Sequence, residues 1–591
     1  MANTLLDLFE KNPQLLEWRD KVTLLSRQLV MGFSGSSKAV VMASALSEQV
    51  PKILIVTSTQ NEAEQLTGDL SAILGEDKVY SFFADDVVAA EFIFASPEKT
   101  HSRLESLNFL IDKEASGVLV TSLVGTKLHL PNPKVYKDSR INLALGEEHD
   151  LEALSKHLTH IGYQRVEQVF SPGEFSRRGD ILDIYELTAE LPYRLEFFGD
   201  EIDGIRQFDS DSQKSLDNLE HIIVSPADDI ILTREDYQRA EKALESAVSK
   251  AEGPHKAYLE EVLSVTIDGY RHKDLRKFLS LFYDKAYTLF DYLPKGTPVF
   301  IDDFQKIVDR HGRLELEVAN LLTEDLHQGK SLSHLNYLVD SFKTLRNYQP
   351  ASFFSNFHKG LGNLKFDKLY QFTQYPMQEF FNQFPLLVDE IHRYTKNKAT
   401  VILQVGSEKQ LKSLKETLEE YDLDLPLSSF GDLIPHKPQL VLGNLSNGFY
   451  FADEKLVLVT EREIFHKKVK RRARASHVSN AERLKDYNEL EKGDYVVHQT
   501  HGIGQFKGIE TIEIKGVHRD YLTIQYQDAA TISLPVEQIE SLSKYVSADG
   551  KEPKINKLND GRFQKTKQKV SKQVEDIADD LLKLYAERSQ L

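Results

Sequence analysis

The chain has 591 residues, too many for one hydrophobic core, which suggests four or five domains of ~100–150 residues. Apolar residues make up 41% and charged residues 28%, as in ordinary globular proteins, and the net charge of −18 argues against a protein that coats nucleic acid. Cysteine is absent, which excludes disulfides, a thiolate nucleophile and cysteine-ligated metal centres. With no signal-peptide pattern and no run of ~20 apolar residues, we expect a cytoplasmic protein without a membrane anchor.

Residues 1–128 alternate short apolar runs with helical patterns. The apolar runs at 52–59 and 117–125 are flanked by segments of helical spacing at 61–74 and 98–111. This alternation is typical of a parallel sheet that is covered by helices on both faces.

The segment GFSGSSKA, residues 32–39, lies in the sequence context of a phosphate-binding P-loop. A working loop needs glycines that let backbone N–H groups face phosphate, a lysine for the outer phosphates and a Ser or Thr hydroxyl for magnesium. Gly32, Gly35 and Lys38 are present, but the hydroxyl position is Ala39, which cannot ligate a metal. We therefore predict a degenerate, inactive nucleotide site, and nucleotide hydrolysis at this loop is the less favoured alternative.

Between residues 129 and 213 the pattern changes to strands separated by turn signals, which predicts an inserted α+β domain. A charged helical stretch follows, and a buried-strand pattern returns at 297–304. We therefore expect the first sheet to resume after the insertion. The returning strand ends in Asp302 and Asp303, as a magnesium-holding strand beside a P-loop would, but without a hydroxyl at Ala39 an ordinary buried strand is the favoured interpretation.

Three ordered motifs mark the insertion: GYQRVEQV at 162–169, FSPGEFSRRGDILDIY at 170–185 and RLEFFGDEIDGIRQFD at 194–209. Together they resemble the second domain of the excision-repair protein UvrB and its copy in the bacterial transcription-repair coupling factors. In that family the domain docks UvrA, and the resemblance carries this role to Arg165, Phe175 and Arg178. Arginine suits such a surface because its planar fork pairs with carboxylates at two points. The alternative is that Arg178 merely begins a strand and Phe175 fills a core.

The resemblance to UvrB covers roughly the first 350 residues and includes two departures. The sequence has no counterpart of the long aromatic hairpin with which UvrB clamps damaged DNA, and its P-loop is degenerate. Both departures are the pattern of the coupling factors.

Residues 350–460 predict a further small α/β unit, and the basic block at 467–474 is interpreted as a solvated linker. From 493 to 545, short alternating strands with glycine turns predict a five-stranded, SH3-like barrel. This segment resembles the CarD-like RNA-polymerase-interacting domain, which implies edge-strand pairing with the β subunit of RNA polymerase. The contacting residues carried over are Lys507, Gly508, Ile509, Glu510, Thr511, Ile512, Glu513 and Ile514, with Ile512 as the apolar contact. The alternative for Ile512 is an ordinary core position.

The last expected element is one long helix at 562–588, with apolar positions three and four residues apart. In the family the ATP-driven motor begins after this helix, and the sequence holds no second P-loop. The resemblance therefore implies that the motor, with its ATP, its magnesium and most of the DNA contacts, is not part of this chain.

These observations predict a multidomain α/β and α+β scaffold without enzymatic activity. The expected parts are a degenerate P-loop-like α/β domain at 1–128 and 214–345, an inserted α+β domain at 129–213, a small α/β domain at 346–460, a linker at 461–487, the barrel at 488–550 and the helix region at 551–591. The resemblance implies that the scaffold couples transcription to nucleotide excision repair by binding RNA polymerase and UvrA. The alternatives are an active UvrB-like damage-binding helicase subunit and a CarD-type transcription regulator.

Overall fold

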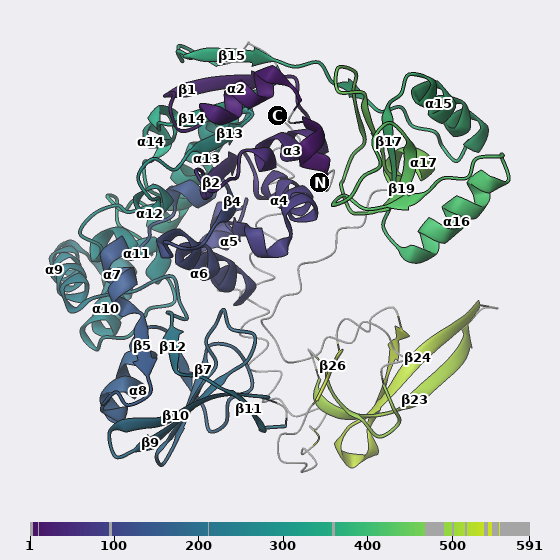
Figure 1. Ribbon diagram of the computed structural model, residues 1–591. Helices are drawn as coiled ribbons and strands as arrows, with labels where there is room; N and C mark the ends of the chain where they lie inside the picture. The colour runs from purple at the N-terminus through teal and green to yellow at the C-terminus, as the bar shows by residue number, and fades with distance from the viewer. Residues whose placement is uncertain are drawn as a thin grey trace. The chain divides into compact units, whose positions relative to one another are not determined.

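The computed structural model describes residues 4–555, apart from 10, 94–96, 211, 357–360, 467–489, 499–500, 515–516, 537–541 and 546–554 (Figure 1). The basic block at 467–474 and the expected helix at 562–588 lie outside the described residues. The chain divides into two units, one made of residues 1–143, 156–163 and 223–476, and the other of the remaining residues. The structure is mixed α/β with several sheets, as the sequence predicted.

A seven-stranded sheet in the order β15-β1-β14-β13-β2-β4-β3 is the centre of the first unit, and its strands pair in parallel. Its strands are β1 (Arg27–Met31), β2 (Lys52–Thr57), β3 (Val79–Phe82), β4 (Gly117–Ser122), β13 (Val299–Asp302), β14 (Ala351–Ser355) and β15 (Lys368–Gln371). Every residue of β2 and β4 is buried, which explains the continuous apolar runs at residues 53–56 and 118–120 within them. Strands β13 and β14, which follow the insertion in the chain, lie between β1 and β2 in this sheet.

The structure corrects the boundary that the sequence suggested between residues 345 and 346. Strands β14 and β15 complete the seven-stranded sheet, and the next sheet begins only with β16 (Tyr375–Pro376). Both strands pair in parallel with β1, more than 300 residues earlier in the chain. Local spacing identifies such a strand, but the sheet that it joins depends on a distant partner.

Helices cover this sheet and extend the unit. They are α1 (Leu5–Phe9), α2 (Pro13–Asp20), α3 (Ser36–Ser44), α4 (Gln60–Leu74), α5 (Val88–Ile93), α6 (Pro97–Ile111), α7 (Pro133–Ser139), α9 (Arg234–Lys250), α10 (Gly253–Ile267), α11 (Leu275–Phe282), α12 (Leu289–Tyr292), α13 (Phe304–His327) and α14 (Phe342–Asn347). No helix in the described part of the chain combines the length and the apolar composition needed to cross a bilayer.

A mixed six-stranded sheet, in the order β16-β20-β21-β17-β19-β18, also belongs to the first unit. It adds β17 (Thr400–Val405), β18 (Leu427–Ser428), β19 (Pro438–Leu442), β20 (Phe449–Phe451) and β21 (Leu456–Val459) to β16, together with the helices α15 (Phe384–Lys396), α16 (Glu408–Glu419) and α17 (Glu461–Phe465). Helices α15 and α16 cover one face of the sheet, around Val401, Leu403 and Val457. The opposite face contributes Ile402, Leu456 and Leu458 to the core of the seven-stranded sheet.

The insertion forms a separate six-stranded sheet in the order β11-β10-β9-β8-β7-β6, and it extends beyond the predicted end at residue 213 because β11 also belongs to this sheet. Its strands are β6 (Gln164–Arg165), β7 (Glu174–Arg178), β8 (Ile181–Ile184), β9 (Tyr193–Phe198), β10 (Glu201–Phe208) and β11 (Ser215–Asn218), and in sequence they lie between β5 (Ile141–Ala144) with α8 (Leu151–His160) and β12 (His221–Val224). Only β6 and β7 pair in parallel. Charged and apolar residues alternate along β9, which leaves one face of the sheet polar.

The C-terminal part is a five-stranded antiparallel sheet in the order β25-β24-β23-β22-β26. Its strands are β22 (Tyr495–His498), β23 (Gly502–Ile514), β24 (Val517–Gln525), β25 (Thr531–Pro535) and β26 (Leu542–Lys544). Buried Val496, Phe506, Leu522 and Ile524 form its small core. Gly504 is required here because a Cβ atom at this position would lie 2.6 Å from the Ile524 side chain.

Candidate functional sites

The polar face of the inserted sheet holds one of the predicted docking arginines. Strand pairing places Arg178, Asp183 and Arg194 across β7, β8 and β9. The buried Asp183 carboxylate accepts hydrogen bonds from Arg178 Nη2 at 3.0 Å and from Arg194 Nε at 2.8 Å. The hydrogen bond from Arg194 to Asp183 raises the pKa of that guanidinium above its ordinary value. Asp183 thus orients Arg178, whose side chain is still 48% exposed and available to a partner.

Arg165 and Phe175 are neighbours in the parallel pair of β6 and β7, but their surroundings differ. Arg165 is exposed on the end strand of the sheet. Phe175 is fully buried, so its ring fills the core, which was the alternative interpretation of this residue. A partner cannot reach Phe175 in this structure, and the three residues therefore do not form one exposed patch.

The sequence motifs did not single out Phe198, the most exposed large apolar residue that the structure shows, at 82% exposure. It ends β9, directly before the turn at Gly199 that leads into β10. Along β9, Arg194, Glu196 and Phe198 alternate with the buried Leu195 and Phe197, so Phe198 lies on the polar face with Arg194. The pair of phenylalanines before Gly-Asp was the available signal, because strand alternation allows only one of them to face the core.

The predicted polymerase-contacting segment lies in the longest strand of the C-terminal sheet. Residues 502–505 of β23 pair with β22, whereas 508–514 pair with β24 on one side, and no other strand of the described residues pairs with them. A bulge at Gly508, with φ of +137°, marks the change. Ile509 beside it is 43% exposed, and Glu510 and Thr511 are exposed as well.

Of the other predicted contact residues, Lys507 is exposed before the bulge. Ile512 lies opposite Arg519, Glu513 opposite His518 and Ile514 opposite Val517 in the backbone register. Among the described residues, the segment 508–514 is therefore an edge of the kind that another strand can extend.

The P-loop-like segment connects β1 to α3, as the sequence context predicted. Gly32 and Gly35 have φ of +102° and +58°, where a side chain is strained. Lys38 Nζ lies 2.7 Å from Asp302 Oδ1 at the end of β13, and Ala39 is fully buried in the core. The lysine that would hold phosphate thus pairs with the carboxylate that would hold magnesium.

Asp303, the second carboxylate, is the N-cap residue before α13 and has a left-handed conformation with φ of +52°. Its nearest cation is Lys306, at 3.8 Å, and Lys306 also contacts Glu62 at 2.9 Å. The hydrogen bond with Glu62 raises the pKa of Lys306. Within the described residues, no group of three or more histidine, aspartate or glutamate side chains is placed to hold a metal ion.

Three protein families match separate stretches of this chain. The UvrB interaction domain matches residues 141–229, the MFD D3 domain matches 394–464, and the CarD-like/TRCF RID domain matches 490–546. Along nearly its whole length, the chain is 35% identical over 576 residues to the transcription-repair-coupling factor of Bacillus subtilis, covering 95% of this chain and 49% of that relative. The corresponding proteins of Staphylococcus haemolyticus and Staphylococcus aureus are 32% and 31% identical over 570 residues, with 95% of this chain and 48% of each relative covered.

This chain is a relative of the transcription-repair-coupling factors. It spans about half the length of the curated relatives that it matches. Arg165, Arg178 and Phe198 lie in the stretch matched by the UvrB interaction domain, and the β23 edge lies in the stretch matched by the CarD-like/TRCF RID domain. Strands β17 to β21 lie in the stretch matched by the coupling factors' own D3 domain. The three family models do not cover the P-loop-like segment.

Proposed function

We propose that this chain is a binding scaffold that couples transcription to nucleotide excision repair. The C-terminal sheet binds the β subunit of RNA polymerase, and the inserted sheet recruits UvrA. The observation that carries the proposal is that one chain joins a UvrB interaction domain to a CarD-like/TRCF RID domain. A protein with both surfaces holds the stalled polymerase and the repair machinery at the same place.

The polymerase contact is made by strand addition to β23. Its free edge at 508–514 supports this mode of binding, because backbone hydrogen bonds supply the affinity and alternate side chains supply the specificity. Ile512 lies opposite Arg519 within this edge. We expect the five strands to form an SH3-like barrel, the fold that the resemblance implies.

UvrA docks on the polar face of the inserted sheet. Arg178, held by Asp183, supplies a preoriented guanidinium on this face, whereas Arg165, opposite Phe175 in the register, adds a second exposed guanidinium at the end strand, outside this face. Phe198 supplies an exposed aromatic anchor on that face. Exposed arginine and aromatic side chains are the residues that most often dominate interface energies, which supports this surface as the docking patch.

The chain itself performs no ATP hydrolysis and takes no cofactor in this proposal. Ala39 supplies no magnesium ligand, and the Lys38–Asp302 ion pair joins the two groups that would otherwise hold phosphate and metal. We assign the family's ATP-driven motor, and most of the DNA contacts, to the half of the relatives that this chain does not cover. An active helicase subunit is the less favoured function for the same reasons.

A pull-down of the whole chain with purified UvrA and with a fragment of the RNA polymerase β subunit tests the proposal. Binding of both partners is the expected result. Binding of polymerase alone would favour a CarD-type transcription regulator, and binding of neither would overturn the scaffold function.

A further inference from the structure

A buried polar cluster connects the P-loop-like segment to the six-stranded sheet of the first unit. Ser36, the first residue of α3, is fully buried, and its Oγ donates to Asp69 Oδ2 at 3.2 Å and accepts from the Asn447 N–H at 2.9 Å. Asp69 also accepts from the Ser446 N–H at 2.8 Å and from Ser446 Oγ at 2.7 Å. Ser446 and Asn447 lie between β19 and β20, so the buried Asp69 carboxylate is satisfied across the two sheets.

The backbone of the loop is approached closely by other parts of the chain. A Cβ atom on Gly32 would lie 2.0 Å from the Phe372 carbonyl oxygen, and one on Gly35 would lie 3.3 Å from the Asn447 side chain. The Ser34 N–H donates to Gln374 Oε1 at 3.3 Å. In a working P-loop the glycines let phosphate approach the backbone. Here the chain that passes from β15 to β16, and the loop after β19, take that place.

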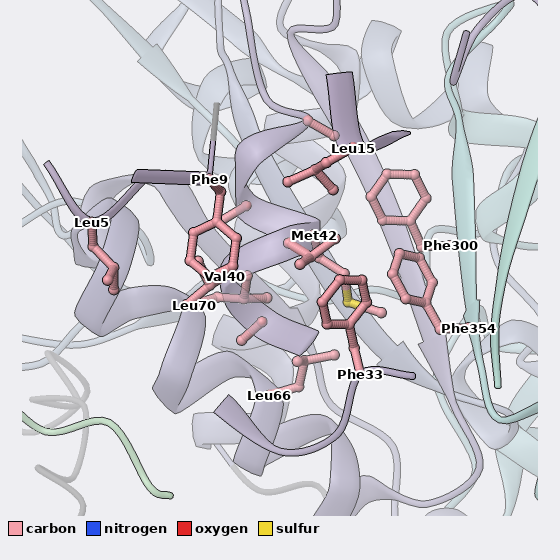
Figure 2. Packing of buried hydrophobic residues seen from close by; sticks show 14 of the residues in the cluster. Leu5, Phe9, Leu15, Phe33, Val40, Met42, Leu66, Leu70, Phe300 and Phe354 are labelled. Carbon is pink, nitrogen blue, oxygen red and sulfur yellow. The ribbon is translucent and has the colours of Figure 1, made fainter. Parts of the chain in front are cut away.

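An apolar contact lies beside the polar cluster. The Phe451 ring of β20 packs with its centre 5.1 Å from that of Phe9 and 5.5 Å from that of Phe33. Figure 2 shows Phe9 and Phe33 with Val40 of α3 in the same packed cluster. One continuous core therefore joins the loop, α1 and α3 to the six-stranded sheet.

We propose that the P-loop-like segment, residues 32–39, is the docking site for the six-stranded sheet of the same chain. The glycines and hydroxyls of the loop bind protein atoms in place of phosphate. Two consequences follow. The two sheets of the first unit move as one rigid body, and the loop stays closed to nucleotide even if a hydroxyl is restored at Ala39. This inference concerns only the first unit and does not depend on which partners the chain binds.

Hydrogen–deuterium exchange on the whole chain tests the docking. Asp69→Ala removes the acceptor that Ser36 and Ser446 share, so amide exchange should rise on the order of tenfold in residues 444–451 and 34–38, with little change in β2 and β4. Glu64→Ala removes an exposed carboxylate from the same helix, α4, and is the matched control. Equal exchange in the two variants would overturn the proposal.

A cross-link tests the contact without weakening it. The hydroxyl oxygens of Ser36 and Ser446 lie 3.1 Å apart, and the chain has no cysteine of its own, so Ser36→Cys with Ser446→Cys introduces a single possible disulfide. Oxidation should close it nearly completely, as mass spectrometry of the digested protein would show. The control pair is Ser44→Cys with Ser446→Cys. Its cysteine on α3 lies roughly 12 Å further along the helix than residue 36, so this pair should stay reduced. If the first pair fails to close, or closes no better than the second, the two segments do not dock.

Discussion

At the scale of single residues, the candidate sites depend on which charges are paired within the chain and which face solvent. Asp183 is buried and binds two arginines, so it positions Arg178 without removing it from the surface. Lys38 and Asp302, by contrast, form an ion pair with each other. The same kinds of side chain thus predict partner binding at the first site and chemical inactivity at the second.

For the docking patch, we expect Arg178→Ala to weaken UvrA binding by roughly thirtyfold, because loss of an interface arginine typically costs ~2 kcal/mol. The fold should persist, since Arg194 still pairs with Asp183. Titration calorimetry with purified UvrA measures the change.

Arg177→Ala is the matched control for this variant. Arg177 is the preceding residue of β7, and it pairs with Glu152. The Arg177→Ala variant should bind UvrA as tightly as the unsubstituted chain does. Phe198→Ala should weaken binding, as Arg178→Ala does. If Arg178→Ala and Phe198→Ala both bind normally, the docking surface lies elsewhere.

For the P-loop-like segment, we expect no magnesium-dependent ATP turnover by this chain. Ala39→Thr should not create activity, because Lys38 remains paired with Asp302 and the loop remains in contact with Gln374. Phosphate release at saturating ATP and magnesium measures this. Turnover that disappears in Lys38→Ala would contradict the inactive site.

At the scale of elements, β23 combines a paired side and a free side in one strand. Residues 502–505 of β23 pair with β22, whereas residues 508–514 pair only with β24 among the described strands. An open edge promotes aggregation unless charge shields it, and the exposed Lys507 and Glu510 supply such charge. The strand is therefore suited to stay soluble until a partner strand pairs with it.

On this edge, we expect Ile512→Arg to abolish binding to the β-subunit fragment, because an arginine would be buried there without a partner in the complex. Ile509→Arg should have a similar effect, since Ile509 is already exposed in the free chain. Co-elution in gel filtration measures binding, and circular dichroism checks the fold.

Thr531→Arg places the same charge on the exposed surface of β25, at the far end of the sheet, and should leave polymerase binding intact. A folded Ile512→Arg variant that still co-elutes with the fragment would rule out the β23 edge as the binding site for the β subunit. Unfolding of the Ile512→Arg variant would instead indicate that Ile512 is a core residue.

At the scale of the whole molecule, the two proposed partner surfaces belong to sheets that share no strand. We therefore expect saturation with the β-subunit fragment to change the Kd for UvrA by less than about fivefold, because coupling of about 1 kcal/mol or more would require a shared two-state element. Calorimetric titration of UvrA into the chain, with and without the fragment, measures this. A larger change in either direction would show that the surfaces communicate.

The sequence by itself identified the elements and supported predictions that depend on a single residue type. Continuous apolar runs at 53–56 and 118–120 identified β2 and β4, because a strand buried on both faces carries apolar side chains at successive positions. Ala39 alone predicted an inactive loop, since the side chain of alanine has no hydroxyl oxygen to bind magnesium. The motifs around Arg178 and Gly508 likewise lie within short stretches, where a resemblance is readable without the fold.

Tertiary structure decided which face each residue occupies and which distant segment it meets. Phe175 and Phe198 are both phenylalanines in strands of one sheet, yet one is fully buried and the other is 82% exposed, because burial depends on what packs on each face. Strands β14 and β15 joined the first sheet through β1, and Asn447 reached Ser36 across 411 residues of sequence. The spacing of residues within one segment does not indicate which distant segment it will contact, so only the folded chain reveals such contacts.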